Sequence, residues 1–562
     1  MTTSGDMNAI IIGAGPAGIS IAYRLKHELG FDDFTMYDKM DGVGGTWRAN
    51  TYPGCGCDLK SHLYSFSFNP NPSWSKELCE QPEILRYIED TVDKFGLRPH
   101  VHTSVECLGA AWLADEERWE VRLKDLATGI SYSRKANALV SAVGAISFPR
   151  EVKFPGMEKF HGPMFHTARW DHSVNYRGKR IAVIGNGCSA AQVVPAVAKD
   201  AAFVKQYARS GQWLHDRPNR NYTDFEKIMF RFFPLWQRAL RLKIFLDADE
   251  ETTAYFPTPK GIRIRAAMEA ESTKYIKSKV PPKYSKTLIP DFPLGCKRRV
   301  FDPGYLESLN LPNVELLPEG IKEMTETGIV SSSGIVDDFD IIVLATGFQV
   351  SQFLTPMHIV GKTGVSLHDQ WKECRGAQAY LGTHVHNFPN MAILFGPNTF
   401  PANNSALFAC ETQAAFAVKS LFKPLLDRRA TVVEVKQTAE DRETNAIHQQ
   451  LKNTVFSGDC SNWYIGDYGR NAASWPGKAV SYWAATFFPD WSAFNLTGGT
   501  YFWPVNAAWR TTRTAPVFLK VSVFCIALYL ARGRMRKDTL PGVTGLWMSA
   551  MDKVRNVVGV AR

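Results

Sequence analysis

A glycine-rich turn near the start of the chain constrains the fold more than any other feature of the sequence. The apolar run Ala9–Ile12 leads directly into Gly13, Gly15 and Gly18, which are spaced as G-x-G-x-x-G. A run of Ala and Ile without polar alternation predicts a buried parallel strand, and a helix pattern follows the glycines. Asp38 ends the next expected strand, where an acid accepts hydrogen bonds from ribose hydroxyls. The segment therefore predicts a dinucleotide site with pyrophosphate at the helix N-terminus.

A second unit of the same kind begins at residues 180–184. Its third fingerprint position is alanine, which the pattern permits. After the next expected strand the sequence supplies Lys205 and Arg209, where the first unit has an acid. A cation there suits the 2′-phosphate of NADPH, and a surface position at a strand end is the alternative for Arg209. The residues expected at this second site are Gly185, Asn186, Gly187, Cys188, Ser189, Ala190, Gln192, Arg209 and Ser210.

Two such units predict an α/β protein with two Rossmann-like dinucleotide-binding domains, a helical insertion and a C-terminal tail. We place the first domain at 1–150 and 376–480, and the second at 151–375 with the insertion at about 214–295. The tail, 481–562, contains an apolar segment at 515–531 that Lys520 interrupts. This segment is shorter than the roughly 20 residues of a membrane span. A buried or interface-lying helix is favoured, and membrane contact is open but not favoured.

Composition narrows the partners and the compartment. The formal net charge is +10 and the pI about 9.0, without any run of five Lys or Arg residues. Such diffuse charge indicates a solvated surface or phosphate-rich cofactors, so we expect no nucleic-acid partner. Ten cysteines without a C-x-x-C indicate free, mostly buried thiols in a reducing compartment. We therefore expect a cytoplasmic protein, peripheral at a membrane only if the tail binds one, with no metal site and an undetermined oligomeric state.

A family resemblance enters between the two units. Phe160, Gly162, His166, Trp170 and Asp171 match F-x-G-x-x-x-H-x-x-x-W-P/D, the signature of type I Baeyer–Villiger monooxygenases. The Gly-Gly-Thr-Trp element at 44–47 is also similar to that family, and the tail most resembles fungal biosynthetic members. The resemblance implies FAD at the first site and NADPH at the second. It also implies insertion of one oxygen atom of O2 into a small-molecule ketone, which gives an ester or lactone in secondary metabolism.

The resemblance also implies roles for single residues. Arg298, in the Gly-Cys-Lys-Arg element, would be the active-site arginine, and Asp58 the acid that pairs with it. Arg299 follows directly and competes for the role, although position favours Arg298. His166 would be structural rather than catalytic. The further cofactor contacts implied are Gly45, Thr46, Trp47, Cys57, Asp58, Tyr64 and Val105 for the flavin, and Lys297 and Trp463 for NADP.

Three other functions fit parts of the pattern. A related flavin monooxygenase would oxygenate N or S, or form an epoxide, through neutral hydroperoxyflavin. A flavin disulfide reductase needs a redox-active cysteine pair near the flavin, which the sequence does not place there. A flavin-binding module without activity at a membrane would use the apolar tail, but it would not need Arg298, Asp58 and the complete signature.

Overall fold

The computed structural model describes residues 7–146, 148–350, 352–457, 460, 462, 464–466 and 468–511. The chain forms two compact units. One comprises the described residues up to Phe422 together with Val433–Asn495, and the other comprises Lys423–Val432 and the described residues from Leu496. Trp463 and the apolar segment at 515–531 lie outside the described residues. Within the described ranges, no helix is long and apolar enough to cross a membrane.

The first sheet is built on the first glycine turn. Its five strands are all parallel in the order β19-β7-β1-β2-β3, and Ala9 of β1 pairs with Phe34 of β2. Helix α1 follows β1 directly and packs against α11. The strands are β1 (Ala9–Ile12), β2 (Phe34–Tyr37), β3 (Val101–His102), β7 (Ala138–Ser141) and β19 (Met391–Ile393). The helices of this part are α1 (Pro16–Tyr23), α2 (Thr46–Ala49), α3 (Gln81–Lys94), α10 (Leu367–Glu373), α11 (Ala406–Ala417), α13 (Gln437–Leu451) and α14 (Ala479–Phe487).

The second sheet repeats this arrangement around the second glycine turn. Its strands are all parallel in the order β13-β10-β9-β17-β8, with a buried core on β9, β10 and β17. Helix α4 begins directly after the glycines. The elements are β8 (Met164–His166), β9 (Arg180–Ile184), α4 (Cys188–Val197), β10 (Phe203–Tyr207), α9 (Tyr305–Ser308), β13 (Val314–Leu317) and β17 (Ile341–Leu344). The two parallel sheets confirm the expected α/β class with two Rossmann-like halves.

Two further sheets have four and three strands. One has the order β18-β4-β5-β6 and the other β14-β15-β16. Strand β18 pairs with β4, so the chain has returned to the first half before residue 376, where we expected the second part of the first domain to begin. The division of the chain into domains stays a prediction. The strands are β4 (Val105–Leu113), β5 (Arg118–Asp125), β6 (Ser131–Ala136), β14 (Ile321–Met324), β15 (Gly328–Ser331), β16 (Val336–Asp338) and β18 (His358–Val360).

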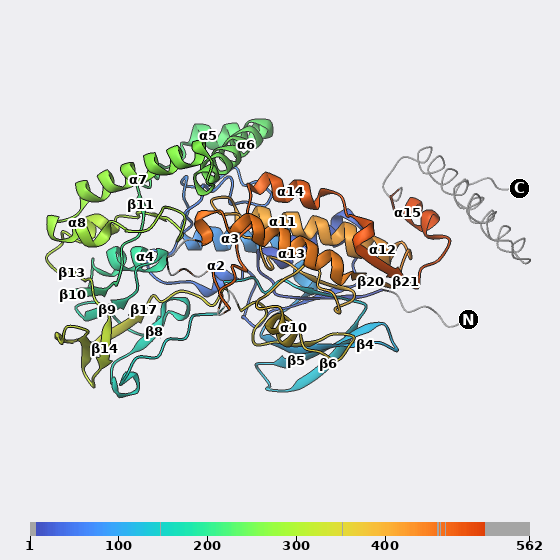
Figure 1. The fold of residues 1–562 in the computed structure, drawn as a ribbon, viewed down its shortest axis with the longest axis horizontal. Helices are drawn as coiled ribbons and strands as arrows, with labels where there is room; N and C mark the ends of the chain where they lie inside the picture. Colours follow the sequence, from blue (N-terminus) through green and yellow to red (C-terminus); the bar gives the residue numbers. More distant parts are fainter. Residues whose placement is uncertain are drawn as a thin grey trace, which may run out of the picture. The chain divides into compact units, whose positions relative to one another are not determined.

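The helical insertion leaves and rejoins the second half at one place. Strand β11 pairs in parallel with β12, and these two short strands bracket the inserted helices, which are green in Figure 1. The elements are β11 (Leu214–His215), α5 (Asp224–Phe232), α6 (Pro234–Glu251), α7 (Pro259–Lys279), α8 (Pro282–Leu288) and β12 (Val300–Phe301). The remaining elements are α12 (Lys423–Leu426), β20 (Val432–Val435), β21 (Phe494–Thr497) and α15 (Trp503–Thr511).

Candidate active site

The first glycine turn makes room for a ligand by close backbone contacts. Gly13 has φ +107°, and a Cβ there would lie 2.5 Å from the carbonyl oxygen of Ala142. A Cβ on Gly18 would lie 2.0 Å from the oxygen of Gly13, so only glycine lets α1 begin this close to β1. Gly15 faces Gly45, and a Cβ on Gly45 would lie 2.9 Å from the Gly15 Cα. Two loops thus meet without side chains between them.

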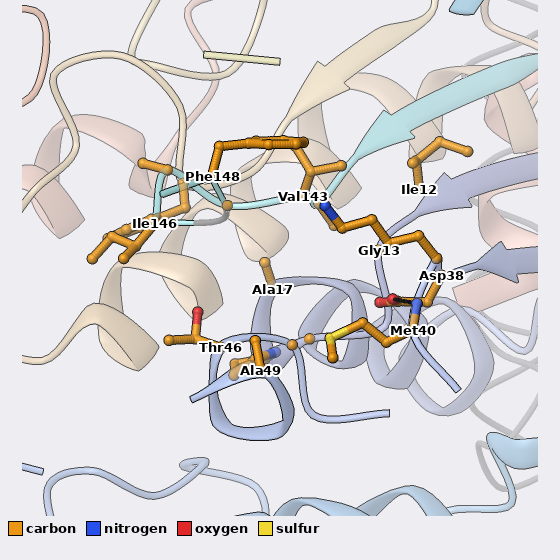
Figure 2. Close-up of a pocket in the computed structure, with 18 of the residues that line it drawn as sticks. Ile12, Gly13, Ala17, Asp38, Met40, Thr46, Ala49, Val143, Ile146 and Phe148 are labelled. Atoms are coloured by element: carbon orange, nitrogen blue, oxygen red, sulfur yellow. Dashed lines mark hydrogen bonds between the residues drawn. The ribbon is translucent and has the colours of Figure 1, made fainter. Parts of the chain in front are cut away.

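A cavity opens beside these loops (Figure 2), with Asp38 towards one end and Ile146 towards the other. It contains about 1290 Å³ of empty space, part of it open to solvent. Most of the residues expected at the first site line it, whereas Gly18, Cys57 and Asp58 do not. Those that line it are Gly13, Gly15, Asp38, Gly45, Thr46, Trp47, Tyr64 and Val105. Sequence reasoning did not find the lining from distant segments, which includes Phe148, Met357, Phe395, Leu407 and Cys410.

Asp38 is held by the backbone around it. Its Oδ2 accepts a hydrogen bond from the Ala14 amide at 2.7 Å, and its Oδ1 accepts one from the Met40 amide at 2.9 Å. Burial raises the pKa of this carboxyl, and the two amide hydrogen bonds oppose the rise. On another wall, the Trp47 indole N–H donates to the Tyr64 hydroxyl at 2.9 Å, so these two aromatic side chains are positioned together.

The second glycine turn has an open face. A Cβ on Gly185 would lie 2.2 Å from the Ala345 oxygen, whereas a Cβ on Gly187 would meet nothing within 4 Å. The Asn186 amide group donates to the Ser210 carbonyl at 2.5 Å, which links the turn to the loop after β10. Ala190 is fully buried against the strand, as its place in the fingerprint requires. The open side of Gly187 therefore leaves space in front of the α4 N-terminus.

Helix α4 is also bound to the first half of the chain. The Tyr52 hydroxyl donates to the Gln192 side chain at 2.8 Å and lies 3.4 Å from the Ser189 hydroxyl. The Gln192 amide donates in turn to the Gly56 carbonyl at 3.0 Å. Burial raises the pKa of the Cys188 thiol, the first residue of α4, to about 11, so this thiol stays protonated at neutral pH. These contacts bring the segment around Asp58 to the start of α4.

A small basic cluster lies beside the second glycine turn. Lys297 donates to the Ser210 hydroxyl at 3.3 Å and lies over the Phe292 ring. Burial lowers the pKa of Lys297, and the positive charge of nearby Arg209 lowers it further. Arg209 itself is exposed. Lys205 takes no part, because it is buried and forms ion pairs with Asp337 at 2.7 Å and Glu315 at 3.3 Å.

Arg298 and Asp58, which are 240 residues apart, form an ion pair. The Arg298 Nη2 lies 2.6 Å and its Nε 3.2 Å from the same carboxylate oxygen, Oδ2. The third donor, Nη1, reaches the Ala402 carbonyl at 3.4 Å. Burial raises the pKa of Asp58, but the charge and hydrogen bonds of Arg298 outweigh it and the net shift is downwards. The Asp58 carboxylate raises the pKa of Arg298 above its usual value, so both groups are charged at neutral pH.

Arg299 points elsewhere. Its guanidinium is buried, bonds to Glu251 at the end of α6, and lies 4.6 Å from the Phe301 ring centroid. Its Nε has no hydrogen-bond partner among the residues that the structure describes. Of the two neighbouring arginines, Arg298 is thus the one beside Asp58 and the α4 N-terminus, and Arg299 attaches the inserted helices.

The signature histidine has a structural position. The Nδ1 of His166 accepts a hydrogen bond from the Ala168 amide at 3.0 Å, and the ring packs edge-on against Phe348. Burial lowers the pKa of His166 to about 4, so the ring is neutral at physiological pH. Trp170 is buried nearby, beside Phe165. The signature residues therefore pack the edge strand β8 against the loop that follows β17.

Two features of the site could not be read from the sequence. Cys296 and Cys460 form a disulfide with a Cα–Cα distance of 6.2 Å, which corrects the expectation of free thiols for this pair. The bond ties the element that carries Lys297 and Arg298 to the segment at Cys460. Arg217 also donates to the Cys57 carbonyl at 2.5 Å and adds positive charge near Asp58. Neither contact has a local sequence signal, because each joins segments far apart in the chain.

Two parallel sheets with glycine turns, one beside a cavity and one beside a basic cluster, define an oxidoreductase class that binds two dinucleotides. Residues 10–223 match the family described as pyridine nucleotide-disulphide oxidoreductase. A Baeyer–Villiger monooxygenase from Pseudomonas aeruginosa is 36% identical over 490 residues, which cover 87% of this chain and 91% of the relative. The FAD-binding monooxygenase ktnD from Aspergillus niger is 34% identical and covers 87% of this chain and 81% of its own length.

Solved structures agree with these relatives. The cyclohexanone monooxygenase of Rhodococcus sp. Phi1 bound to NADP+ superposes with a TM-score of 0.77 at 28% identity, covering 88% of this chain and 99% of its own. An oxidized steroid monooxygenase bound to NADP gives a TM-score of 0.76 at the same identity and coverage. The chain belongs to the Baeyer–Villiger monooxygenase family, and it is therefore an oxidoreductase of the monooxygenase type.

Proposed function

We propose that this enzyme uses FAD and NADPH to insert one oxygen atom of O2 into a small-molecule ketone, giving an ester or lactone. The observation that carries the proposal is the Arg298–Asp58 ion pair, which lies beside Cys188 at the N-terminus of α4. A Baeyer–Villiger oxidation needs a permanent cation where negative charge develops, and a guanidinium stays charged at any working pH. Relatives named Baeyer–Villiger monooxygenase support the same reaction class.

The residues present fit both cofactors. The cavity beside Gly15 and Gly45 has the two side-chain-free loops that a pyrophosphate requires, and Asp38 stands where a ribose would be bound. At the second site, the open face of Gly187 leaves the backbone accessible to a second pyrophosphate. Arg209, with Lys297 beside it, supplies positive charge for a 2′-phosphate. The first site therefore suits FAD and the second suits NADPH.

The bound flavin supplies the redox chemistry, passing electrons from NADPH to O2. The chain's own residues supply charge and position. Arg298 offers N–H donors in a rigid fork, and Asp58 holds that fork through two of them. The Ala402 carbonyl fixes the third donor group. The pair joins Asp58, in a loop of the first half, to Arg298, at the end of the helical insertion. The fold itself therefore positions the cation before any substrate arrives, and such positioning is called electrostatic preorganisation.

The test is product analysis with the purified holoenzyme. Cyclic, linear and polyketide-like ketones are incubated with NADPH and O2. A tertiary amine and a thioether are incubated in the same way as alternative substrates, and all products are identified by mass spectrometry. We expect products one oxygen heavier than the ketones, with ester or lactone fragmentation. Oxygenation of only the amine or thioether would instead assign the enzyme to N- or S-oxygenation.

We also propose a role in secondary metabolism, which is supported by the Aspergillus relatives ktnD and tazF. The cytoplasmic location expected from the sequence belongs to the same proposal. It is supported by seven free cysteines in the described part of the chain, five of them buried, whereas the Cys296–Cys460 disulfide opposes it. Cell fractionation with a tagged chain tests the location, and recovery of the enzyme in a secreted fraction would contradict it.

A further inference from the structure

The joint between α5 and α6 exposes a run of large apolar side chains. Phe232 is 70% exposed, Phe233 56%, Leu235 78% and Trp236 59%, and the intervening Pro234 is exposed too. A run of four or more consecutive exposed apolar residues is unusual on a protein surface in water and marks a site of interaction. The joint is therefore a candidate interaction surface.

The exposed residues continue along one side of each helix. On α5, Phe225 and Ile228 precede Phe232 at spacings of three and four residues, which places all three on one face. On α6, Leu242 and Leu246 follow at helical spacing and are more than half exposed. We call Phe225, Ile228, Phe232, Phe233, Leu235 and Trp236 the apolar edge.

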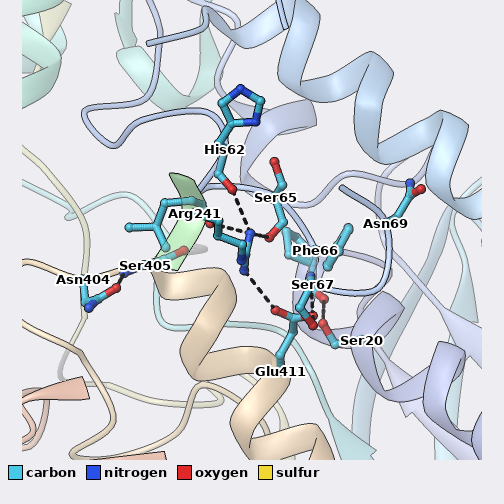
Figure 3. Close-up of polar contacts among 12 residues, drawn as sticks. Ser20, His62, Ser65, Phe66, Ser67, Asn69, Arg241, Asn404, Ser405 and Glu411 are labelled. Atoms are coloured by element: carbon cyan, nitrogen blue, oxygen red, sulfur yellow. Dashed lines mark hydrogen bonds and ion pairs between the residues drawn. The ribbon is translucent and has the colours of Figure 1, made fainter. Parts of the chain in front are cut away.

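The opposite side of α6 is fixed by polar contacts, so the apolar edge cannot turn inwards. Arg241 donates from Nη1 to the carbonyls of His62, Leu63 and Ser65 at 2.7–3.2 Å (Figure 3). Its Nη2 lies 3.7 Å from the buried carboxylate of Glu411.

Two further side chains of α6 strengthen this attachment. Gln237 donates to the Asn71 carbonyl at 2.7 Å. Asp249 accepts from Asn404 at 2.8 Å and from the first amides of α14. Leaving such buried polar groups unpaired is costly, so the contacts of Arg241 and Gln237 determine which face of α6 remains outside, whereas Asp249 anchors the C-terminal end of the helix.

The exposed charges around the apolar edge are positive on balance. Between Asp224 and Asp247 the sequence has five cationic and three anionic side chains, and one of the five, Arg241, faces inwards. The three anions are already paired, Glu226 with Arg220, Asp224 with Lys227 and Asp247 with Lys243. Arg238 is exposed and forms no ion pair within the described part of the chain. Aromatic and aliphatic side chains rimmed by Lys and Arg are typical of helices that lie in the interface of an anionic bilayer.

We propose that the apolar edge docks on the surface of an anionic lipid membrane. Phe232, Phe233, Leu235 and Trp236 enter the headgroup region, and the surrounding Lys and Arg side chains contact lipid phosphates. A second copy of the chain fits less well, because a two-fold contact would place this basic rim against itself and like charges repel. The apolar edge belongs to the inserted helices and is distinct from the tail segment at 515–531.

Flotation of the full-length holoenzyme with vesicles tests the proposal. Wild-type protein is mixed with phosphatidylcholine vesicles with or without phosphatidylserine, and the bound fraction is measured at low and high salt. We expect binding to the phosphatidylserine vesicles that weakens as salt screens the charges. The double variant Phe232→Ser/Trp236→Ser should bind at least about tenfold more weakly, because it removes two inserted aromatic side chains.

A matched control removes exposed apolar side chains elsewhere. Leu126 and Ile130, 45% and 62% exposed on the β5–β6 turn, are changed to serine. This control should bind vesicles like the wild type, and both variants should keep their flavin absorbance and melting temperature. The readout is lipid binding alone, so it is independent of whether the enzyme oxidises ketones.

Three results would overturn the proposal. Wild-type protein that does not float with phosphatidylserine vesicles has no docking surface for them. A Phe232→Ser/Trp236→Ser variant that floats as well as wild type places the binding elsewhere, for instance in the tail. A wild-type dimer that the same variant converts to monomer, without vesicle binding, assigns the apolar edge to a second copy of the chain.

Discussion

Replacing Arg298 by alanine tests the proposed chemistry most directly. The side chains of Arg298 and Asp58 are only 27% and 22% exposed, so water screens their interaction weakly. At about 4 Å between charge centres and an effective dielectric constant of about 20, such a pair is worth about 4 kcal/mol. An anion that forms during the reaction would interact with Arg298 by a similar amount. Losing this interaction should slow oxygen insertion by about 10²–10³-fold, which is the usual effect of removing one preorganised donor.

The assay measures three quantities in Arg298→Ala, Asp58→Asn and Arg299→Ala. These are bound flavin, NADPH consumption and ester formed per NADPH. We expect Arg298→Ala to bind FAD, since Arg298 does not line the cavity, and to oxidise NADPH while forming H2O2 instead of ester. Arg299→Ala should lower thermal stability, because Glu251 loses its partner. It should still form nearly as much ester per NADPH as the wild type.

The outcome separates three readings of the arginine pair. Near-normal ester formation by Arg298→Ala together with loss in Arg299→Ala would transfer the role to Arg299. Normal ester formation by both variants would refute the argument that a fixed cation drives the reaction. Loss of flavin from Arg298→Ala would show that the variant disturbs the fold, and Arg298→Lys, which keeps the charge without the fork, would then replace it in the assay.

Other changes test the remaining parts of the site. Gly15→Val should yield protein without flavin colour, and a full FAD complement would contradict the first site. Arg209→Ala should raise KM for NADPH about tenfold or more with little change for NADH, because a charge-assisted bond to phosphate is lost. Replacing Cys296 and Cys460 by serine should lower the free energy of unfolding by about 2–4 kcal/mol in denaturant titrations, and alkylation of both thiols without reductant would exclude the bond. The pKa of Asp58 is lowered from 3.8 on folding, so its stabilisation is present above pH 3.8 and is lost as pH falls below it. The stability difference between wild type and Asp58→Asn should therefore shrink in acid.

The sequence by itself was sufficient for the two halves of the fold. Glycine turns such as Gly13 are dictated by backbone sterics within a few residues, and the short apolar runs before the two turns form the buried parallel strands β1 and β9. The fold class was therefore predictable, and the resemblance at Phe160–Asp171 correctly indicated the family. The lining of the first cavity by the turn residues follows from the same local geometry.

Only the tertiary structure decided which charged and sulfur-containing side chains meet. Arg298 and Arg299 are neighbours in sequence, but one reaches Asp58 and the other Glu251 because their side chains leave the backbone in different directions. Lys205 has the charge expected at a phosphate site, yet acids from β13 and β16 neutralise it. The Cys296–Cys460 bond closes a separation of 164 residues. Such contacts depend on how sheets and insertions pack, a long-range property that local patterns do not carry.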